Sequence, residues 1–375
     1  MKKETVSNSY DVIILGAGIN GCGIARELSL RGKEVLVIDK STIGSGTSSK
    51  SSRLIHGGLR YLETLQFGLV HEALTDREEL MTLYPDIVHL RSFYFPIYKG
   101  SPRPAWMVWL GLKFYDLLVG KRTNHTSARI PRKLFYDHAP HMVRKNLKAV
   151  FRYFDAKTND ILLTQQVAEN AKSHGAVFIE NVHIQNIRQT SLGWKIILGE
   201  KLMTAPILVN ATGPWIDEVN ERYHLPAQYH IRKISGIHIV IGGTLTEGLM
   251  FMQTKGKRIF FIIPEPNHNR TIIGTTEREE TVPVDDVIVC EDDITYLIEN
   301  INRYLEDSYK INRSDVIDAF IGVRPLIAHK DNPTDLSREY QLDLHTDKET
   351  KLLHVFGGKL TTFLSLAKKA GDLLF

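Results

Sequence analysis

The chain has 375 residues, a length that makes two domains the default expectation. Its composition is that of an ordinary folded protein, which excludes wholesale disorder, and its net charge of +4 is too small to indicate nucleic acid as a partner. The two cysteines, Cys22 and Cys290, are far apart and in no metal-ligand spacing. They predict no metal site, no disulfide framework and a reducing compartment.

The apolar runs are short. Two lysines near the N-terminus precede a run that is too brief for a signal-peptide core, and no stretch reaches the roughly 18 apolar residues of a spanning helix. We therefore expect a cytoplasmic protein, or one held peripherally on the inner face of the cytoplasmic membrane.

The first expected element is a buried strand over residues 11–15, an apolar run rich in β-branched side chains. It leads into G-x-G-x-x-G at Gly16, Gly18 and Gly21, then a helical stretch and a second strand that ends at Asp39. In this order, within about 30 residues, the glycines allow a tight turn and a close approach to a pyrophosphate at the helix N-terminus. Asp39 is placed to accept hydrogen bonds from an adenosine ribose, so the unit predicts dinucleotide binding.

Residues 47–52, "TSSKSS", follow where a simple nicotinamide enzyme usually continues with another helix and strand. Their hydroxyls and backbone amides suit a longer, tightly held dinucleotide with a pyrophosphate and a flavin, and so favour FAD over NAD. A flexible surface loop is the alternative that composition leaves open.

Residues 104–120 are apolar, contain two tryptophans and are too short to span a bilayer. Residues 121–150 then carry eight lysines and arginines against a single acid, Asp137. An aromatic, apolar helix beside a cationic segment is typical of an interfacial anchor on an anionic leaflet, which makes 104–150 a candidate membrane-facing segment. A buried helix beside a solvated basic loop is the alternative.

Parallel strands are expected at "GAVFIENV", where Val182 meets the adenine, and at "ILVNATGPW", which ends at Thr212 and Gly213 beside the dinucleotide. Residues 228–290 then read as successive strands joined by turns, which predicts a mostly antiparallel sheet over the flavin. In "VFGGKLTT", two glycines are expected at the start of the last helix, whose N-terminal amides would stabilise negative charge on the reduced flavin.

The predicted fold class is α/β, with a Rossmann-like FAD-binding domain and an interleaved, mostly antiparallel substrate domain. We expect the FAD-binding domain to take residues 9–92, 145–222 and 318–375, and the substrate domain to take 93–144 and 223–317.

Five stretches together resemble the FAD-dependent glycerol-3-phosphate dehydrogenases of the D-amino-acid-oxidase-like flavoproteins: "GAGINGCGIARE", "TSSKSSRLIHGGLRYLE", "NATGPWID", "GVRPL" and "VFGGKLTTF". The resemblance runs from about residue 10 to the end of the chain. Family members usually continue into a helical C-terminal domain, whereas this sequence ends at Phe375. A truncated or naturally short form is therefore expected, and the oligomeric state, a dimer among the options, is left open.

The resemblance implies non-covalent FAD and oxidation of sn-glycerol 3-phosphate to dihydroxyacetone phosphate, with a hydride passing from C2 to flavin N5. It also implies a membrane quinone as electron acceptor. Such a site needs a held flavin, a receptor for the phosphate dianion and a proton acceptor near C2.

Arginine is the expected dianion receptor because its planar fork pairs with phosphate oxygens. Arg60, Arg324 and Arg338 stand in matching motifs, with surface ion pairs as the alternative for each. Arg324 lies in "AFIGVRPLI", an apolar setting where an uncompensated cation would be costly, so a bound anion is its expected partner.

The resemblance implies His238 as the proton acceptor, or as a phosphate or hydroxyl partner, with a satisfied sheet histidine as the alternative. His56 is the competitor and is expected against the isoalloxazine ring. Tyr61 is expected in the wall of the substrate cavity and Lys359 near the flavin or the substrate.

The expected cofactor-binding residues lie in the same motifs and are Gly16, Gly18, Asn20, Gly21, Asp39, Lys40, Thr47, Ser48, Ser49, Ser52, His56, Gly58, Leu59, Val182, Ala211, Thr212, Gly213, Gly358, Lys359, Leu360 and Thr361.

Three other functions stay open from the sequence. One is an oxidase of the same alcohol that uses oxygen, and another is a relative that acts on an amino or hydroxy acid. The third is a flavin-binding protein without turnover.

Overall fold

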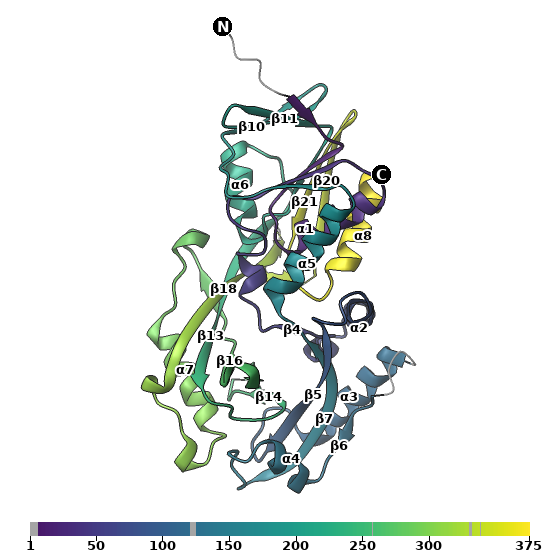
Figure 1. The fold of residues 1–375 in the computed structure, drawn as a ribbon. Coiled ribbons are helices and arrows are strands. Elements are labelled where there is room, and N and C mark those ends of the chain that lie inside the picture. Colours follow the sequence, from purple (N-terminus) through teal and green to yellow (C-terminus); the bar gives the residue numbers. More distant parts are fainter. Residues whose placement is uncertain (1–6, 121–124, 257, 330–331, 338) are drawn as a thin grey trace.

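The computed structural model describes residues 7–120, 125–256, 258–329, 332–337 and 339–375. Figure 1 shows an upper lobe around a mostly parallel sheet and a lower lobe around a long, mostly antiparallel sheet. Strands β13 and β18 run from one lobe into the other (Figure 1).

The upper lobe is built on a six-stranded sheet. Its strands, in spatial order, are β20 (Gln341–Asp347), β21 (Thr350–Phe356), β12 (Ile207–Asn210), β2 (Val12–Leu15), β3 (Val35–Ile38) and β8 (Val177–Ile179). The pairs from β21 to β8 are parallel, and β20 pairs antiparallel with β21. The short central strands β2, β3 and β12 are buried along their whole length, as their continuous apolar runs predict.

Both faces of this sheet are covered. On one face lie α1 (Ile19–Leu30), α5 (Asp160–Ser173) and α8 (Phe363–Leu374). Against the other packs a small sheet in the order β1 (Ser7–Ser9), β11 (Lys201–Ala205), β10 (Gly193–Leu198) and β9 (Asn186–Thr190). This double cover leaves the carboxyl ends of the parallel strands as the open edge where a ligand can bind.

The lower lobe is built on an eleven-stranded sheet. Its strands are β19 (Asn332–Ser337), β18 (Val316–His329), β13 (His230–Gly242), β16 (Arg270–Gly274), β15 (Ile259–Glu265), β14 (Leu249–Gln253), β5 (His89–Tyr98), β7 (Leu147–Lys157) and β4 (Leu54–Ile55), with β17 (Arg278–Glu280) beside β13 and β6 (Ala128–Arg129) beside β7. Strands β14 and β5 are parallel, and the other pairs among the described residues are antiparallel.

The remaining helices are α2 (Phe67–Leu83), α3 (Ala105–Val119), α4 (Arg132–His138), α6 (Ile216–Tyr223) and α7 (Glu291–Asn302), and the short 3₁₀ turns η1 (Thr47–Ser49) and η2 (Leu59–Leu62) matter for the site. Within the described ranges, no helix combines the length and apolarity that crossing a bilayer requires. The same residues contain no group of three or more histidine, cysteine and acidic side chains arranged for a metal ion.

The predicted fold class is confirmed, with two refinements. Strand β13 pairs with β16 and β18, so only β14, β15 and β16 form a simple meander. Helix α8 begins at Phe363, so Gly357 and Gly358 precede a turn and do not start the helix as expected.

The predicted domain ranges stay a prediction. The two large sheets do alternate along the chain, as an interleaved organisation requires. Strands β4, β7 and β18 fall mostly in ranges expected for the FAD-binding domain, yet they are hydrogen bonded into the lower sheet.

Candidate functional site

A cavity of about 770 Å³ lies between the lobes and is lined by both. It begins at the carboxyl ends of β2, β3 and β12 and extends to β13, β18 and the turn before α8. This volume lies in the range of cofactor and ligand pockets, about 300–1,000 Å³. Most of the predicted site residues line it.

The glycine turn after β2 is as tight as predicted. Gly16 has φ +98°, and a Cβ there would lie 2.7 Å from the carbonyl oxygen of Ala211. A Cβ on Gly21 would lie 1.9 Å from the carbonyl oxygen of Gly16, so the first turn of α1 packs directly on the glycine turn. Gly21 therefore shapes the turn from behind, while Gly18 lines the cavity.

Asp39 at the end of β3 holds this turn together. One carboxylate oxygen accepts the Ala17 N–H at 2.6 Å and the other accepts the Ser41 N–H at 2.8 Å. Burial raises the pKa of the Asp39 carboxyl, against the opposing effect of these two hydrogen bonds. Each oxygen keeps a second lone pair, so Asp39 can still accept a hydrogen bond from a ribose hydroxyl in the cavity.

Lys40 follows Asp39 and reaches across to the other lobe. Its ammonium lies 2.6 Å from a carboxylate oxygen of Asp285 and 4.4 Å from the ring centroid of Trp215. The Trp215 indole N–H also donates to Asp285, at 3.0 Å. Neither Trp215 nor Asp285 was predicted, although "NATGPWID" contains the tryptophan; the aspartate gave no local signal.

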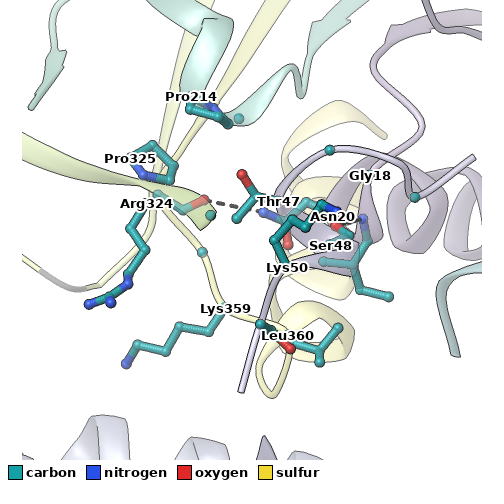
Figure 2. A pocket seen from close by; sticks show the side chains of 18 of the residues that line it. Gly18, Asn20, Thr47, Ser48, Lys50, Pro214, Arg324, Pro325, Lys359 and Leu360 are labelled. Carbon is teal, nitrogen blue, oxygen red and sulfur yellow. Dashed lines mark hydrogen bonds between the residues drawn. The ribbon is translucent and has the colours of Figure 1, made fainter. Parts of the chain in front are cut away.

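The serine-rich segment is an internal wall of the site and not a surface loop. Figure 2 shows Thr47 and Ser48 between Gly18 and the strand that carries Arg324. The Ser48 hydroxyl accepts the Ile19 N–H at 2.9 Å, and the Thr47 hydroxyl donates to the Val323 carbonyl at 2.8 Å. Ser49 instead turns its hydroxyl onto the carbonyls of Ser45 and Gly46, each at 3.0 Å.

Lys359 and Asn20 contribute buried polar atoms that have no hydrogen-bond partner within the described part of the chain. These atoms are the Lys359 ammonium and the Asn20 side-chain oxygen. The ammonium lies 3.9 Å from the centre of the Tyr61 ring, while the Asn20 amide nitrogen donates to the Gly357 carbonyl at 3.2 Å. Burying such groups without a partner is costly, which indicates a polar ligand in the cavity.

His238 lies on β13, is 3% exposed, and stacks on Phe320 of β18 with ring centroids 4.9 Å apart. Its Nε2 lies 2.8 Å from the Ser52 hydroxyl. Burial, followed by the positive charges of Arg324 and Arg53, lowers the pKa of His238 to about 3. The imidazole is therefore neutral at physiological pH.

Arg324 on β18 lines the cavity and also has a carboxylate partner within the chain, so its role as the anion receptor stays a prediction. Its guanidinium lies 3.3 Å from the Glu277 carboxylate and donates to the Thr275 hydroxyl at 3.0 Å. Its side chain is 33% exposed, and Pro325 and Leu326 after it line the cavity as well. The glycine at position 236 leaves room for it, since a Cβ there would lie 2.2 Å from one guanidinium nitrogen.

Two predicted arginines cannot be placed. Arg338 and the side chain of Arg60 lie outside the described residues, so the predicted cluster of three arginines remains a prediction. The other predicted cofactor residues, except Gly21 and Ser49, line the cavity. Among them are His56, Gly58 and Leu59 from the serine-rich side, Val182, Ala211, Thr212 and Gly213 from the sheet edge, and Gly358, Leu360 and Thr361 before α8.

These features fit FAD. The glycine turn and the first turn of α1 suit a pyrophosphate, Asp39 suits a ribose, and the unpartnered Asn20 oxygen and Lys359 ammonium face a polar ligand. The residues present therefore match an extended dinucleotide along the cavity.

Comparison with known proteins agrees with this fit. The family pattern of FAD dependent oxidoreductases matches residues 11–367. The chain is 35% identical over 368 residues to a D-erythritol 1-phosphate dehydrogenase of Brucella abortus and 37% identical over 374 residues to the aerobic glycerol-3-phosphate dehydrogenase of Escherichia coli. Each match covers 96% of this chain and 72% of the relative.

Solved structures show the same fold. A glycerol-3-phosphate dehydrogenase from Bacillus halodurans complexed with FAD superposes with a TM-score of 0.76 at 21% identity, covering 98% of this chain and 64% of the other. A glycine oxidase from Geobacillus kaustophilus superposes with a TM-score of 0.74 at 20% identity, covering 98% and 94%. The chain thus belongs to the FAD-dependent oxidoreductases and, within them, to the family of the glycerol-3-phosphate dehydrogenases.

Proposed function

We propose that the protein oxidises sn-glycerol 3-phosphate to dihydroxyacetone phosphate, with FAD as hydride acceptor and a membrane quinone as the next electron carrier. The observation that carries this proposal is the cation pair at the far end of the cavity. Figure 2 shows Arg324 and Lys359 both extending away from the Gly18 turn. Two relatives that match 96% of this chain are named as dehydrogenases of polyol phosphates, which supports a phosphate-bearing substrate.

In this proposal the guanidinium of Arg324 binds the phosphate dianion. It has five N–H donors, so it can bind phosphate while keeping its contact with Glu277. Arg60 and Arg338 are proposed as additional phosphate ligands, and Lys359 and Tyr61 as the wall that orients the glycerol carbons.

His238 is proposed to accept the C2 hydroxyl proton. When Nε2–H donates to Ser52, Nδ1 carries the lone pair, and this buried atom has no hydrogen-bond partner among the described residues. The charge of Arg324 lowers the His238 pKa, so a bound dianion next to Arg324 would raise it and favour proton uptake. FAD supplies the two-electron acceptor for the C2 hydride.

The remaining predicted cofactor residues are proposed to bind FAD where they line the cavity. Gly18, Ser48 and Asn20 lie at the pyrophosphate end, and Asp39 and Val182 at the adenosine end. The turn before α8 lies at the flavin end, and His56 is proposed to face the isoalloxazine ring.

Anaerobic titration with substrate tests this function. Adding sn-glycerol 3-phosphate to the purified holoprotein without oxygen should bleach the visible absorbance of FAD, because the flavin takes two electrons. D-erythritol 1-phosphate is the matched comparison, since one relative bears that name. Bleaching by the four-carbon substrate alone, or by neither, would overturn the proposed substrate. Reoxidation by a quinone analogue without peroxide would separate a dehydrogenase from an oxidase.

The proposed route to quinone is the face of α3. Six large apolar side chains there are exposed, which excludes a fully buried helix: Trp106, Met107, Trp109, Leu110, Phe114 and Leu117. The described basic residues of the following segment are exposed as well: Arg129, Arg132, Lys133, Arg144, Lys145 and Lys148. Such a pairing favours binding to an anionic leaflet on the cytoplasmic side.

An apolar cavity of about 340 Å³ lies between η2 and α3. Leu59, Phe251 and Ile259 line both this cavity and the FAD cavity. We propose it as the approach for the apolar quinone head, since it is lined by α3 residues and shares three wall residues with the cavity proposed for FAD.

Replacing Trp106 and Trp109 by glutamine should weaken binding to anionic vesicles about tenfold or more, because two large aromatic anchors are lost. Flotation with vesicles measures this. The control is Leu192→Gln, which removes an exposed apolar side chain from the turn between β9 and β10. Flotation that neither the double replacement nor high salt reduces would contradict a membrane-facing α3.

A further inference from the structure

Two side chains from the α3 region hold the two ends of the segment 57–63, which carries Arg60 and Tyr61. At the first end, the Gly57 N–H donates to the Tyr115 hydroxyl at 2.8 Å. Tyr115 lies in the C-terminal half of α3 on its buried side and is 2% exposed.

The Tyr115 hydroxyl is itself fixed by a buried ion pair. It donates to the Asp155 carboxylate, whose two oxygens lie at 2.7 and 2.9 Å. Arg77 on α2 donates to the same carboxylate at 2.7 Å, and both ionic side chains are almost fully buried. Burial and the negative charge of Asp155 raise the pKa of Tyr115 well above its ordinary value, so the phenol stays protonated and keeps donating.

At the second end, the Glu63 carboxylate pairs with the guanidinium of Arg103 through two nitrogens, one of them at 2.8 Å. Arg103 precedes α3 and is 8% exposed, and its backbone N–H donates to the side-chain oxygen of Gln253 at 3.1 Å. A forked pair of this kind restrains direction as well as distance.

The segment is also pressed against its neighbours at Gly57. A Cβ there would lie 2.5 Å from the Tyr115 hydroxyl and 2.7 Å from Leu74. On the preceding residue, the His56 N–H donates to the Thr361 hydroxyl at 3.2 Å. The backbone between His56 and Tyr61 is thus fixed by the turn before α8 and by α3.

We propose that Tyr115 and Arg103 are positioning residues: by holding Gly57 and Glu63 they set the place of the short turn η2, and with it of His56 and Tyr61, against flavin and substrate. This rests on the proposed function for the identity of the substrate. The position of α3 thereby controls the geometry of the site, although no residue of α3, a helix that the structure describes in full, lines the cavity.

The test compares Tyr115→Phe with a matched control in the FAD-loaded protein. The control is Tyr98→Phe, which removes a phenol that donates to the Val143 carbonyl at 3.0 Å and packs on Tyr304 in the lower lobe. Tyr115→Phe removes the hydrogen bonds to Gly57 and Asp155, whereas Tyr98→Phe removes the one to Val143, so Tyr115→Phe should melt at a somewhat lower temperature while both variants retain FAD. Only Tyr115→Phe should alter the visible circular dichroism of the flavin and slow its reduction by substrate, about tenfold.

Arg103→Gln should raise KM for the substrate. In the double variant Tyr115→Phe/Arg103→Gln, the loss in rate should be smaller than the product of the two single losses, because both residues hold the same segment. Arg103→Lys should recover only part of the loss because it lacks the fork. Equal flavin spectra and reduction rates in Tyr115→Phe and Tyr98→Phe would overturn the proposal, as would independent losses in the double variant. The circular dichroism is recorded without substrate and therefore does not depend on the proposed reaction. If substrate failed to reduce the flavin of the wild-type protein, the proposed function would be contradicted, while the dichroism would still test the positioning role.

Discussion

Replacing Arg324 by glutamine should lower kcat/KM for sn-glycerol 3-phosphate about 10³-fold while FAD stays bound. Removing one partner of a desolvated, hydrogen-bonded charge pair costs about 2–5 kcal/mol, and the phosphate dianion would lose its forked donor. Arg324 lies beside Glu277 at the end of the cavity proposed for the substrate, and extends away from the glycine turn proposed for the pyrophosphate (Figure 2). Rapid-mixing measurement of flavin reduction at varied substrate concentration gives the limiting reduction rate and the apparent dissociation constant, whose ratio corresponds to kcat/KM for this substrate.

Controls separate phosphate binding from loss of an ion pair. Arg278→Gln removes another guanidinium, paired with Glu280 at 2.8 Å, that does not line the cavity. Arg324→Lys keeps the charge without the fork and should be intermediate. With unphosphorylated glycerol the Arg324→Gln loss should largely vanish. A loss on the phosphorylated substrate no greater than that of Arg278→Gln would contradict the assigned role.

Replacing Gly21 by alanine should abolish the holoprotein. The new Cβ would lie 1.9 Å from the Gly16 carbonyl oxygen, a contact with backbone that no rotamer change relieves. Opening the turn would move the first turn of α1 and the Asp39 hydrogen bond at Ala17 together, at a cost of about 3 kcal/mol or more. The ratio of flavin to protein absorbance and the melting temperature measure the effect.

Two further glycines make this prediction specific. Gly68 lies in α2 with nothing within 4 Å of its would-be Cβ, so Gly68→Ala should be neutral or slightly stabilising. At Gly18 the nearest atom is the movable Ser48 hydroxyl at 3.3 Å, so Gly18→Ala should fold and yet bind FAD more weakly. A yellow Gly21→Ala protein with the melting temperature of wild type would refute the packing argument.

Local sequence patterns predicted a large part of the upper lobe. Strand β2, the glycine turn, helix α1 and strand β3 all lie within residues 12–38, so the pairing of β2 with β3 and the turn that joins β2 to α1 involve residues near one another in sequence. The resemblance to known motifs then indicated FAD and the cavity-lining glycines. Helix α3 was also predictable, because its apolar run is long enough to be helical and too short to cross a membrane.

The partners of the polar side chains were decided only by the tertiary structure. The Glu277 partner of Arg324 was not identified, and β13 was expected in a plain meander, because sequence spacing carries no information on which distant residue lies alongside. Ser48 meets Ile19, Ser52 meets His238 and Tyr115 meets Gly57 across 29, 186 and 58 residues.

The sequence by itself thus determined the element types, the dinucleotide turn and the apolar helix, since periodicity and steric demand act over a few residues. Only the tertiary structure decided that Glu277 sits beside Arg324, that Ser49 faces away from the cavity, and that α3 holds the segment carrying Tyr61. A hydrogen bond requires its two heavy atoms to lie within about 3 Å of each other. For groups so far apart in sequence, only the tertiary structure decides whether they come that close.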